Sequence, residues 1–301
     1  SSPSSFFGLR AVIALTCSGR RAINLLRSPD TMPHRTLNVP EHGMIDAYEN
    51  QLRTRGFKSD PAQRAAAQVT QRAIAFALVH VTMQCRSQEA ILTELLGDLV
   101  DRGPDSAGVI ARTRLWQQHA HVRVLAGNHE EMFLAAFEKP EALRHFLKHG
   151  GRETVLSYGL SKKQFAALDL EAMFERLPEL VPEDDREYIA AFENMIRAGD
   201  YVFVHAGIDP ARPLDEQKRS DLLWIRERFL SHEGPLEKVV VHGHTIFDRV
   251  MDCGNRIGID TGAFRSGVLT ALVLEGDQRR ILQARADERG AIEVFHGDRP
   301  H

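Results

Sequence analysis

The sequence predicts an α/β fold in which several strands end in polar motifs at one region of the molecule. From residue 91 onward, four short apolar runs of strand-like composition each stop at a motif rich in Asp, Asn, His and Gly. Helix-like segments lie between several of these runs. Alternating strands and helices are typical of α/β sheets, whose ligands collect beyond the carboxyl ends of the strands. We therefore expect the four motifs to meet.

Each predicted element is read from local patterns of apolar and polar residues. The apolar runs are Ile91–Leu96 before Gly97-Asp98, His121–Ala126 before Gly127-Asn128-His129-Glu130, Tyr201–Val204 before His205-Ala206-Gly207, and Val239–Val241 before His242-Gly243-His244-Thr245. Helices are expected at 106–119, 130–149 and 183–197, with Asp105 as the N-cap of the first. Residues 266–274 and 279–284 flank Gly276 and predict a hairpin that completes a second sheet.

The composition is that of a soluble globular chain without a general affinity for nucleic acid. The chain has 301 residues, of which 43% are hydrophobic and 26% charged, and its formal net charge is −3. Affinity for phosphate must therefore be local. Cys17, Cys85 and Cys253 are far apart and lack CxxC spacing, which favours a reducing compartment, and we expect the cytoplasm. No stretch approaches the roughly 20 apolar residues that span a bilayer, so no membrane partner is expected.

The chain divides at residue 91. Residues 91–285 form the predicted domain, 44–90 an atypical helical and strand-like segment, and 286–301 a polar tail. Residues 1–43 are expected to be a disordered leader. The apolar run at 11–17 resembles the core of a secretory signal or transit peptide, but the run is at the short limit and no A-x-A-like cleavage site follows.

The stretch Gly97–Gly103 carries the densest chemistry. It places Asp98, Asp101 and Arg102 within five residues, where an apolar run gives way to a glycine-flanked loop. A carboxylate can bridge two hard cations, and the planar fork of arginine donors matches phosphate oxygens. A calcium loop of the EF-hand type is excluded, because Val100 and Arg102 stand where oxygen ligands are required.

Four side chains, one from each motif, could share a metal ion. Asp98, Asn128, His205 and His244 offer one carboxylate, one amide oxygen and two imidazoles. This mixed set suits manganese, iron(II), cobalt, nickel or zinc. Each residue alone has an ordinary explanation, such as a turn or a hydrogen-bonded histidine at a strand end. Their equivalent positions after four strands favour one shared site.

The ordered set of motifs resembles the calcineurin-like metallophosphoesterases. The resemblance is to the bacterial phosphoprotein-phosphatase branch, which includes bacteriophage-type serine/threonine phosphatases and symmetrical diadenosine tetraphosphatases. It implies a two-sheet β-sandwich flanked by helices. The motifs that carry it are GDLVDRGPDS (97–106), LAGNHEEM (125–132), GGRETVLSYG (150–159), DYVFVHAGIDP (200–210), DLLWIRERF (221–229), VVVHGHT (239–245) and IGIDTGA (257–263).

The resemblance also implies roles for individual residues. Asp98 would bridge two metal ions, most readily Mn²⁺, and Asn128, His205 and His244 would complete the shell of the second ion. Arg102 and Arg226 would hold the substrate phosphate, and His129 paired with Asp101 would protonate the leaving group. From the residues alone, Arg226 could equally lie on a solvated helix face, Asp101 and Arg102 could form a local ion pair, and His242 could be a further ligand.

The chain departs from the family in one respect. Members carry an early Gly-Asp-x-His-Gly motif after the first strand, whose Asp and His bind the first metal, and no such motif precedes Gly97. Two hypotheses follow. The chain is a metal-dependent phosphoesterase acting on phosphoproteins or dinucleoside tetraphosphates with one or two ions, or it is an impaired pseudoenzyme or binding module with at most one metal. The segment Leu160–Arg197 is expected to cap the cleft.

Overall fold

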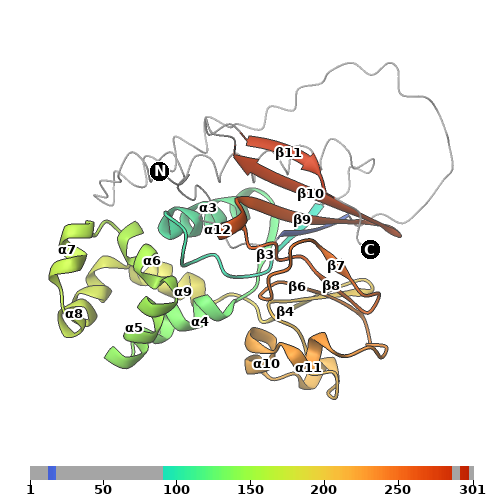
Figure 1. The fold of residues 1–301 in the computed structure, drawn as a ribbon, viewed down its shortest axis with the longest axis horizontal. Coiled ribbons are helices and arrows are strands. Elements are labelled where there is room, and N and C mark those ends of the chain that lie inside the picture. The colour runs from blue at the N-terminus through green and yellow to red at the C-terminus, as the bar shows by residue number, and fades with distance from the viewer. Residues whose placement is uncertain (1–12, 18–90, 287–291, 298–301) are drawn as a thin grey trace.

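The computed structural model describes residues 13–17, 91–286 and 292–297 and folds them into two sheets with flanking helices (Figure 1). This confirms the predicted α/β sandwich. The helical and strand-like segment expected at 44–90 lies outside the described residues.

Six strands form the first sheet in the order β11-β10-β9-β1-β2-β3. They are β1 (Ile13–Cys17), β2 (Ile91–Leu95), β3 (His121–Val124), β9 (Val268–Glu275), β10 (Gln278–Ala286) and β11 (Ile292–His296). The β9–β10 hairpin turns at Gly276 with φ 59°, as predicted. Its assignment to a second sheet was wrong, because β9 pairs with β1 and so lies in the same sheet as β2.

Five strands form the second sheet in the order β4-β5-β6-β8-β7. They are β4 (Met195–Ala198), β5 (Tyr201–Val204), β6 (Val239–His242), β7 (Met251–Asp252) and β8 (Arg256–Gly258). The two central strands, β5 and β6, run parallel, so His205 and Gly243 leave the sheet at the same edge. The four motifs therefore come from two sheets and not from one.

The two sheets pack face to face, and helices cover their outer faces. Phe203 of β5 and Leu272 of β9 belong to one apolar cluster although they come from different sheets. Val202 points the other way and packs with Phe229 beneath the second sheet. Val273 likewise faces away from Leu272, toward the helices of the first sheet. Strands with both faces buried read as continuous apolar runs, which explains why they were recognisable in the sequence.

The helices cluster in two places (Figure 1). Helices α5 to α8 gather at one end of the molecule, on the left in this view, and α10 and α11 lie under the second sheet. The helical elements are α3 (Ser106–His119), α4 (Asn128–Ala135), α5 (Pro140–Phe146), the π-helix η1 (Leu147–Gly151), α6 (Arg152–Ser157), α7 (Lys162–Ala167), α8 (Leu170–Leu180), α9 (Glu183–Ala190), the 3₁₀-helix η2 (Leu214–Glu216), α10 (Arg219–Trp224), α11 (Glu227–Leu230) and α12 (Ala263–Ser266).

Of the three predicted helices, only α3 has the expected bounds. Asp105 caps it as predicted, accepting a hydrogen bond from the Gly108 amide at 3.0 Å. The helix expected at 130–149 breaks because Pro140 cannot continue a helix and forces Lys139 into an extended conformation.

The helix expected at 183–197 also ends early, at Ala190. Residues Met195–Ala198 instead form β4, which pairs with β5 across Gly199-Asp200. Gly199 has φ 56°, which glycine adopts readily in a two-residue hairpin. The Gly-Asp pair was the sequence signal for this hairpin.

Two short strands fall in regions that the sequence assigned to a leader and a tail. Residues Ile13–Cys17 lie between β2 and β9, and Ile292–His296 pairs with β10 at the sheet edge. For these residues the expectations of a disordered leader and a polar tail were wrong, because pairing with distant strands supplies the backbone hydrogen bonds. In the part of the chain that the structure describes, no helix has the length and apolarity needed to cross a membrane.

Candidate active site

The loop after β2 has a backbone that side chains other than glycine seldom adopt. Asp98, Asp101 and Arg102 have φ values of 56°, 71° and 61°. Conformations of this kind persist only where surrounding contacts enforce them, and they cluster at functional sites. The loop therefore needs an anchor.

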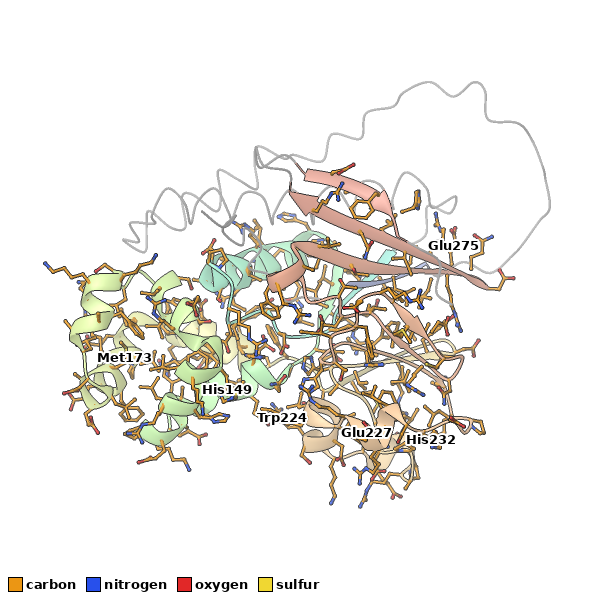
Figure 2. The ribbon with its side chains drawn as sticks, in the orientation of Figure 1. His149, Met173, Trp224, Glu227, His232 and Glu275 are labelled. Carbon is orange, nitrogen blue, oxygen red and sulfur yellow. The ribbon has the colours of Figure 1, made fainter. Side chains whose placement is uncertain are left out.

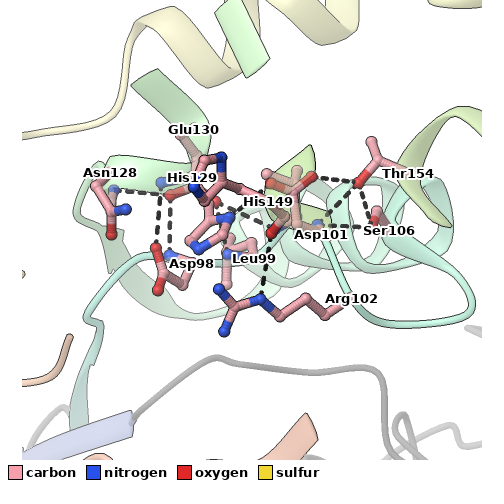
Figure 3. Close-up of polar contacts among 12 residues, drawn as sticks. Asp98, Leu99, Asp101, Arg102, Ser106, Asn128, His129, Glu130, His149 and Thr154 are labelled. Carbon is pink, nitrogen blue, oxygen red and sulfur yellow. Dashed lines mark hydrogen bonds and ion pairs between the residues drawn. The ribbon is translucent and has the colours of Figure 1, made fainter. Parts of the chain in front are cut away.

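Glu130, at the start of α4, is that anchor (Figure 3). Its buried carboxylate accepts hydrogen bonds from the amides of Asp98 at 2.8 Å, Leu99 at 2.6 Å and Val100 at 3.2 Å, and from its own N-cap Gly127 at 2.7 Å. Burial and the nearby Asp98 charge raise the pKa of Glu130 to about 7, and the bonds from the Asp98 and Gly127 amides offset part of that rise because they favour the ionised form. Glu130 was not among the predicted site residues, although a Glu at the third helical position is a capping signal.

The four predicted metal ligands meet at the junction of the two sheets. Asn128 Oδ1 lies 3.0 Å from His205 Nε2 and 2.9 Å from His244 Nδ1, and His205 Nε2 lies 3.4 Å from Asp98 Oδ1. All four side chains are buried, with exposures of 5% or less. The sequence thus predicted a set of residues that the fold does bring together.

The donor chemistry of this cluster fits a divalent ion. His205 Nδ1 lies 2.7 Å from the carbonyl oxygen of Leu96, so a neutral ring donates from Nδ1 and turns its Nε2 lone pair toward Asn128 and Asp98. Oxygen and nitrogen acceptors then face one another at about 3 Å, a repulsive arrangement that a cation relieves. Two ligands at right angles on an ion with bonds of about 2.1 Å lie about 3.0 Å apart.

The Asn128 amide is essential to this set. Among the described residues, no group of three or more His, Cys, Asp or Glu side chains is placed to hold a metal ion. The candidate site is complete only when the amide oxygen of Asn128 is counted with Asp98, His205 and His244.

A histidine–carboxylate pair lies beside the donor cluster (Figure 3). His129 Nδ1 is 2.6 Å from Asp101 Oδ2, and both side chains are buried. Thr154 donates to the other oxygen, Asp101 Oδ1, at 2.7 Å and accepts from the Asp101 amide at 2.8 Å. Burial raises the pKa of the Asp101 carboxyl, and the bonds from His129 and Thr154 offset part of that rise. The pair leaves His129 Nε2 as the nitrogen that can exchange a proton.

Arg102 is held by the second half of the π-helix η1. Its Nε donates to the His149 carbonyl at 3.2 Å, its amide donates to the Gly150 carbonyl at 3.0 Å, and its guanidinium lies 4.8 Å from the centre of the Phe264 ring. Gly150 has φ 116°, and a Cβ there would lie 2.5 Å from Arg102 Cγ. The segment that touches the predicted phosphate arginine therefore precedes Leu160–Arg197, which was expected to cap the site.

The structure places Arg226 at the surface and His242 in the core. Arg226 is exposed just before α11, two residues after Trp224, whose ring lies 6.3 Å from that of His244. His242 is buried, and its ring packs 5.0 Å from Phe229. Burial lowers the pKa of His242 to about 4, so this histidine is a neutral core residue.

Strand β1 ends at the far side of its sheet from the donor cluster. β1 is antiparallel to β2, and Cys17 pairs with Ile91 while Ile13 pairs with Leu95. The chain therefore leaves β1 at the sheet edge opposite Asp98. Within the described residues, the donors that converge beside β2 are Asp98, Asn128, His205 and His244.

Comparisons with known proteins show which family the chain belongs to. Residues 84–262 match the family model of the calcineurin-like phosphoesterases. Serine/threonine-protein phosphatase 1 of Salmonella typhimurium (strain LT2) is 34% identical over 197 residues, which cover 62% of this chain and 81% of that protein. Serine/threonine-protein phosphatase 2 of Escherichia coli (strain K12) is 32% identical over 183 residues, which cover 58% and 76%. A crystal structure of a metallophosphoesterase from Sphaerobacter thermophilus aligns over 67% of this chain and 76% of that one, with 15% identity and a TM-score of 0.30.

The fold, the clustered donors and the family match define a metal-dependent hydrolase of phosphoric esters. More particularly, the chain belongs to the calcineurin-like phosphoesterase family.

Proposed function

We propose that this chain removes phosphate from phosphoserine and phosphothreonine side chains of proteins with the help of Mn²⁺. The observation that carries the proposal is the contact of the buried His129–Asp101 pair, at 2.6 Å, beside the four convergent donors. The names of the curated relatives support a phosphoprotein substrate. The scattered cysteines agree with action in the cytoplasm.

The donor cluster would hold the ion through Asp98, Asn128, His205 and His244. A bound divalent ion lowers the pKa of water and offsets charge on phosphate oxygens. Arg102 would bind the phosphate as a second positive group, with its guanidinium oriented by the His149 carbonyl. Arg226 is exposed, and among the described residues no contact of its guanidinium is seen, so it is available to a substrate.

His129 would act on the leaving group. Asp101 holds Nδ1, which leaves Nε2 to donate a proton to the departing serine or threonine oxygen. An alkoxide is a poor leaving group, so this proton matters most for alkyl phosphates. The p-nitrophenolate released from p-nitrophenyl phosphate is a stable anion and departs without this proton.

The test is hydrolysis of a phosphothreonine peptide and of p-nitrophenyl phosphate by the full chain with Mn²⁺. Asp98→Asn should abolish turnover of both, and Asp277→Asn, in the exposed β9–β10 turn, should leave both unchanged. His129→Asn should lower kcat by about 10²- to 10⁴-fold on the peptide and much less on p-nitrophenyl phosphate. Chelation of the metal should stop turnover, and Mn²⁺ should restore it.

Equal rates for the wild type and Asp98→Asn at every metal tested would support the pseudoenzyme reading and overturn the proposal. Faster hydrolysis of diadenosine tetraphosphate than of the peptide would keep the enzyme and replace its substrate. Metal analysis should give about one equivalent of bound metal per chain, as expected from the one donor set found among the described residues.

A further inference from the structure

Trp224 stands out among the large apolar side chains of the described residues, because it alone is exposed. It keeps 40% of its accessible surface, whereas Leu223 before it and Ile225 after it are buried. Figure 2 shows it at the edge of α10, toward the helices on the left of the view. A single exposed apolar side chain is ordinary on a protein surface, so the position of Trp224 relative to the candidate site decides its meaning.

Trp224 sits beside the donor cluster. Its ring centre lies 6.3 Å from that of His244, with an angle of 76° between the planes. His244 in turn is 2.9 Å from Asn128. The indole therefore borders the position where the substrate phosphate and the group esterified to it would lie.

A polar network fixes the orientation of the indole. Its Nε1 donates to Glu131 Oε2 at 2.6 Å, and Arg219 holds the other oxygen of Glu131 at 3.4 Å while donating to Asn194 Oδ1 at 3.0 Å. Glu131 lies on α4, three residues after Asn128, so the same helix positions a metal ligand and the tryptophan. Because its N–H is already bonded, Trp224 offers solvent only apolar ring surface.

We propose that Trp224 is a specificity-determining residue that contacts the group esterified to phosphate and favours substrates with a flat or bulky apolar group there. The proposal rests on the proposed phosphatase function of the site. Contact between an aromatic ring and such a group is expected to favour binding by about 3- to 10-fold over a group too small to reach it. Small polar leaving groups gain nothing from Trp224.

A binding experiment without turnover tests the proposal. Phenylphosphonate and methylphosphonate carry the same anionic head on a carbon–phosphorus bond, so they differ only in the group that Trp224 would touch. Calorimetric titration of the full chain with Mn²⁺ should give a Kd for phenylphosphonate about 3- to 10-fold below that for methylphosphonate. Trp224→Ala should remove this difference by weakening only the phenyl compound, and Trp224→Phe should keep part of it.

The two tryptophans provide a second readout. Trp116 is 8% exposed within α3, so Trp116→Phe leaves Trp224 as the sole indole without altering the candidate site. In that background, phenylphosphonate should change the fluorescence of Trp224 more than methylphosphonate does at equal saturation. Trp116→Phe should bind both phosphonates as the wild type does.

Three results would overturn the proposal. If Trp224→Ala weakened the binding of both phosphonates equally, Trp224 would only support His244. If the Kd values of both were unchanged, Trp224 would contact neither. No preference for phenylphosphonate in the wild type would also refute it. Absence of peptide hydrolysis with the phenyl preference intact would instead reject the phosphoprotein substrate and keep the contact between Trp224 and the apolar group.

Discussion

Replacing Thr154 by valine tests how the His129–Asp101 pair is held. The Thr154 hydroxyl is fully buried and makes two bonds to Asp101, one to the carboxylate and one from the amide. Valine has nearly the same shape and makes neither bond. In the variant the Asp101 amide can still donate to Ser106 Oγ, which lies at 3.2 Å, but Asp101 Oδ1 loses the hydrogen bond from the Thr154 hydroxyl. A stranded buried acceptor costs about 1–3 kcal/mol and a lost bond about 1 kcal/mol, so the free energy of unfolding should fall by about 2–4 kcal/mol.

Urea denaturation followed by circular dichroism, without added metal, measures this change. Thr154→Ser should keep most of the stability. Thr113→Val is the matched control, because the buried Thr113 hydroxyl bonds only to the Val109 carbonyl of its own helix at 2.9 Å, and its loss should cost about 1 kcal/mol or less.

The same variant should slow catalysis. A looser Asp101 holds His129 less firmly, so kcat on a phosphothreonine peptide should fall about 10-fold with little change in KM. The reasoning is refuted if Thr154→Val is no less stable than Thr113→Val and turns over the peptide at the wild-type rate.

Two further changes address the loop anchor and the packing under the second sheet. Glu130→Gln retains one acceptor oxygen for the four amides that now bond to the Glu130 carboxylate. Titration calorimetry should therefore show a Mn²⁺ affinity about 10- to 100-fold lower than that of the wild type. Glu138→Gln, on the surface, is the control and should bind Mn²⁺ as the wild type does. Equal affinity of Glu130→Gln and Glu138→Gln would remove the anchoring role. Gly207 has φ 154°, and Gly207→Ala would place a Cβ 2.3 Å from Phe229 Cδ1. Thermal denaturation should therefore show a free energy of unfolding about 2–4 kcal/mol lower. Gly199→Ala, at φ 56° in open space, should lose only about 1 kcal/mol, and similar losses for the two would contradict the predicted clash.

Local patterns were enough to find most of the fold and the candidate ligands. Runs such as Tyr201–Val204 were recognisable because both faces of the strand are buried, and Asp105 was recognisable as a cap because its role depends on neighbours three residues away. Asp98, Asn128, His205 and His244 could be grouped because each follows a strand end. The same local reasoning missed the break at Pro140.

Long-range packing settled what the residue pattern left open. Asn128 and His244 are 116 residues apart, and nothing in either motif says that they come from different sheets that pack face to face. The roles of Glu130 and Thr154 depend on amides and a carboxylate 30 to 53 residues away. The reversed direction of β1 likewise depends on its pairing with β2 and β9. The spacing of apolar residues along the chain shows which face of a strand or helix is buried. The partners of a buried polar group, in contrast, depend on which distant segments pack together.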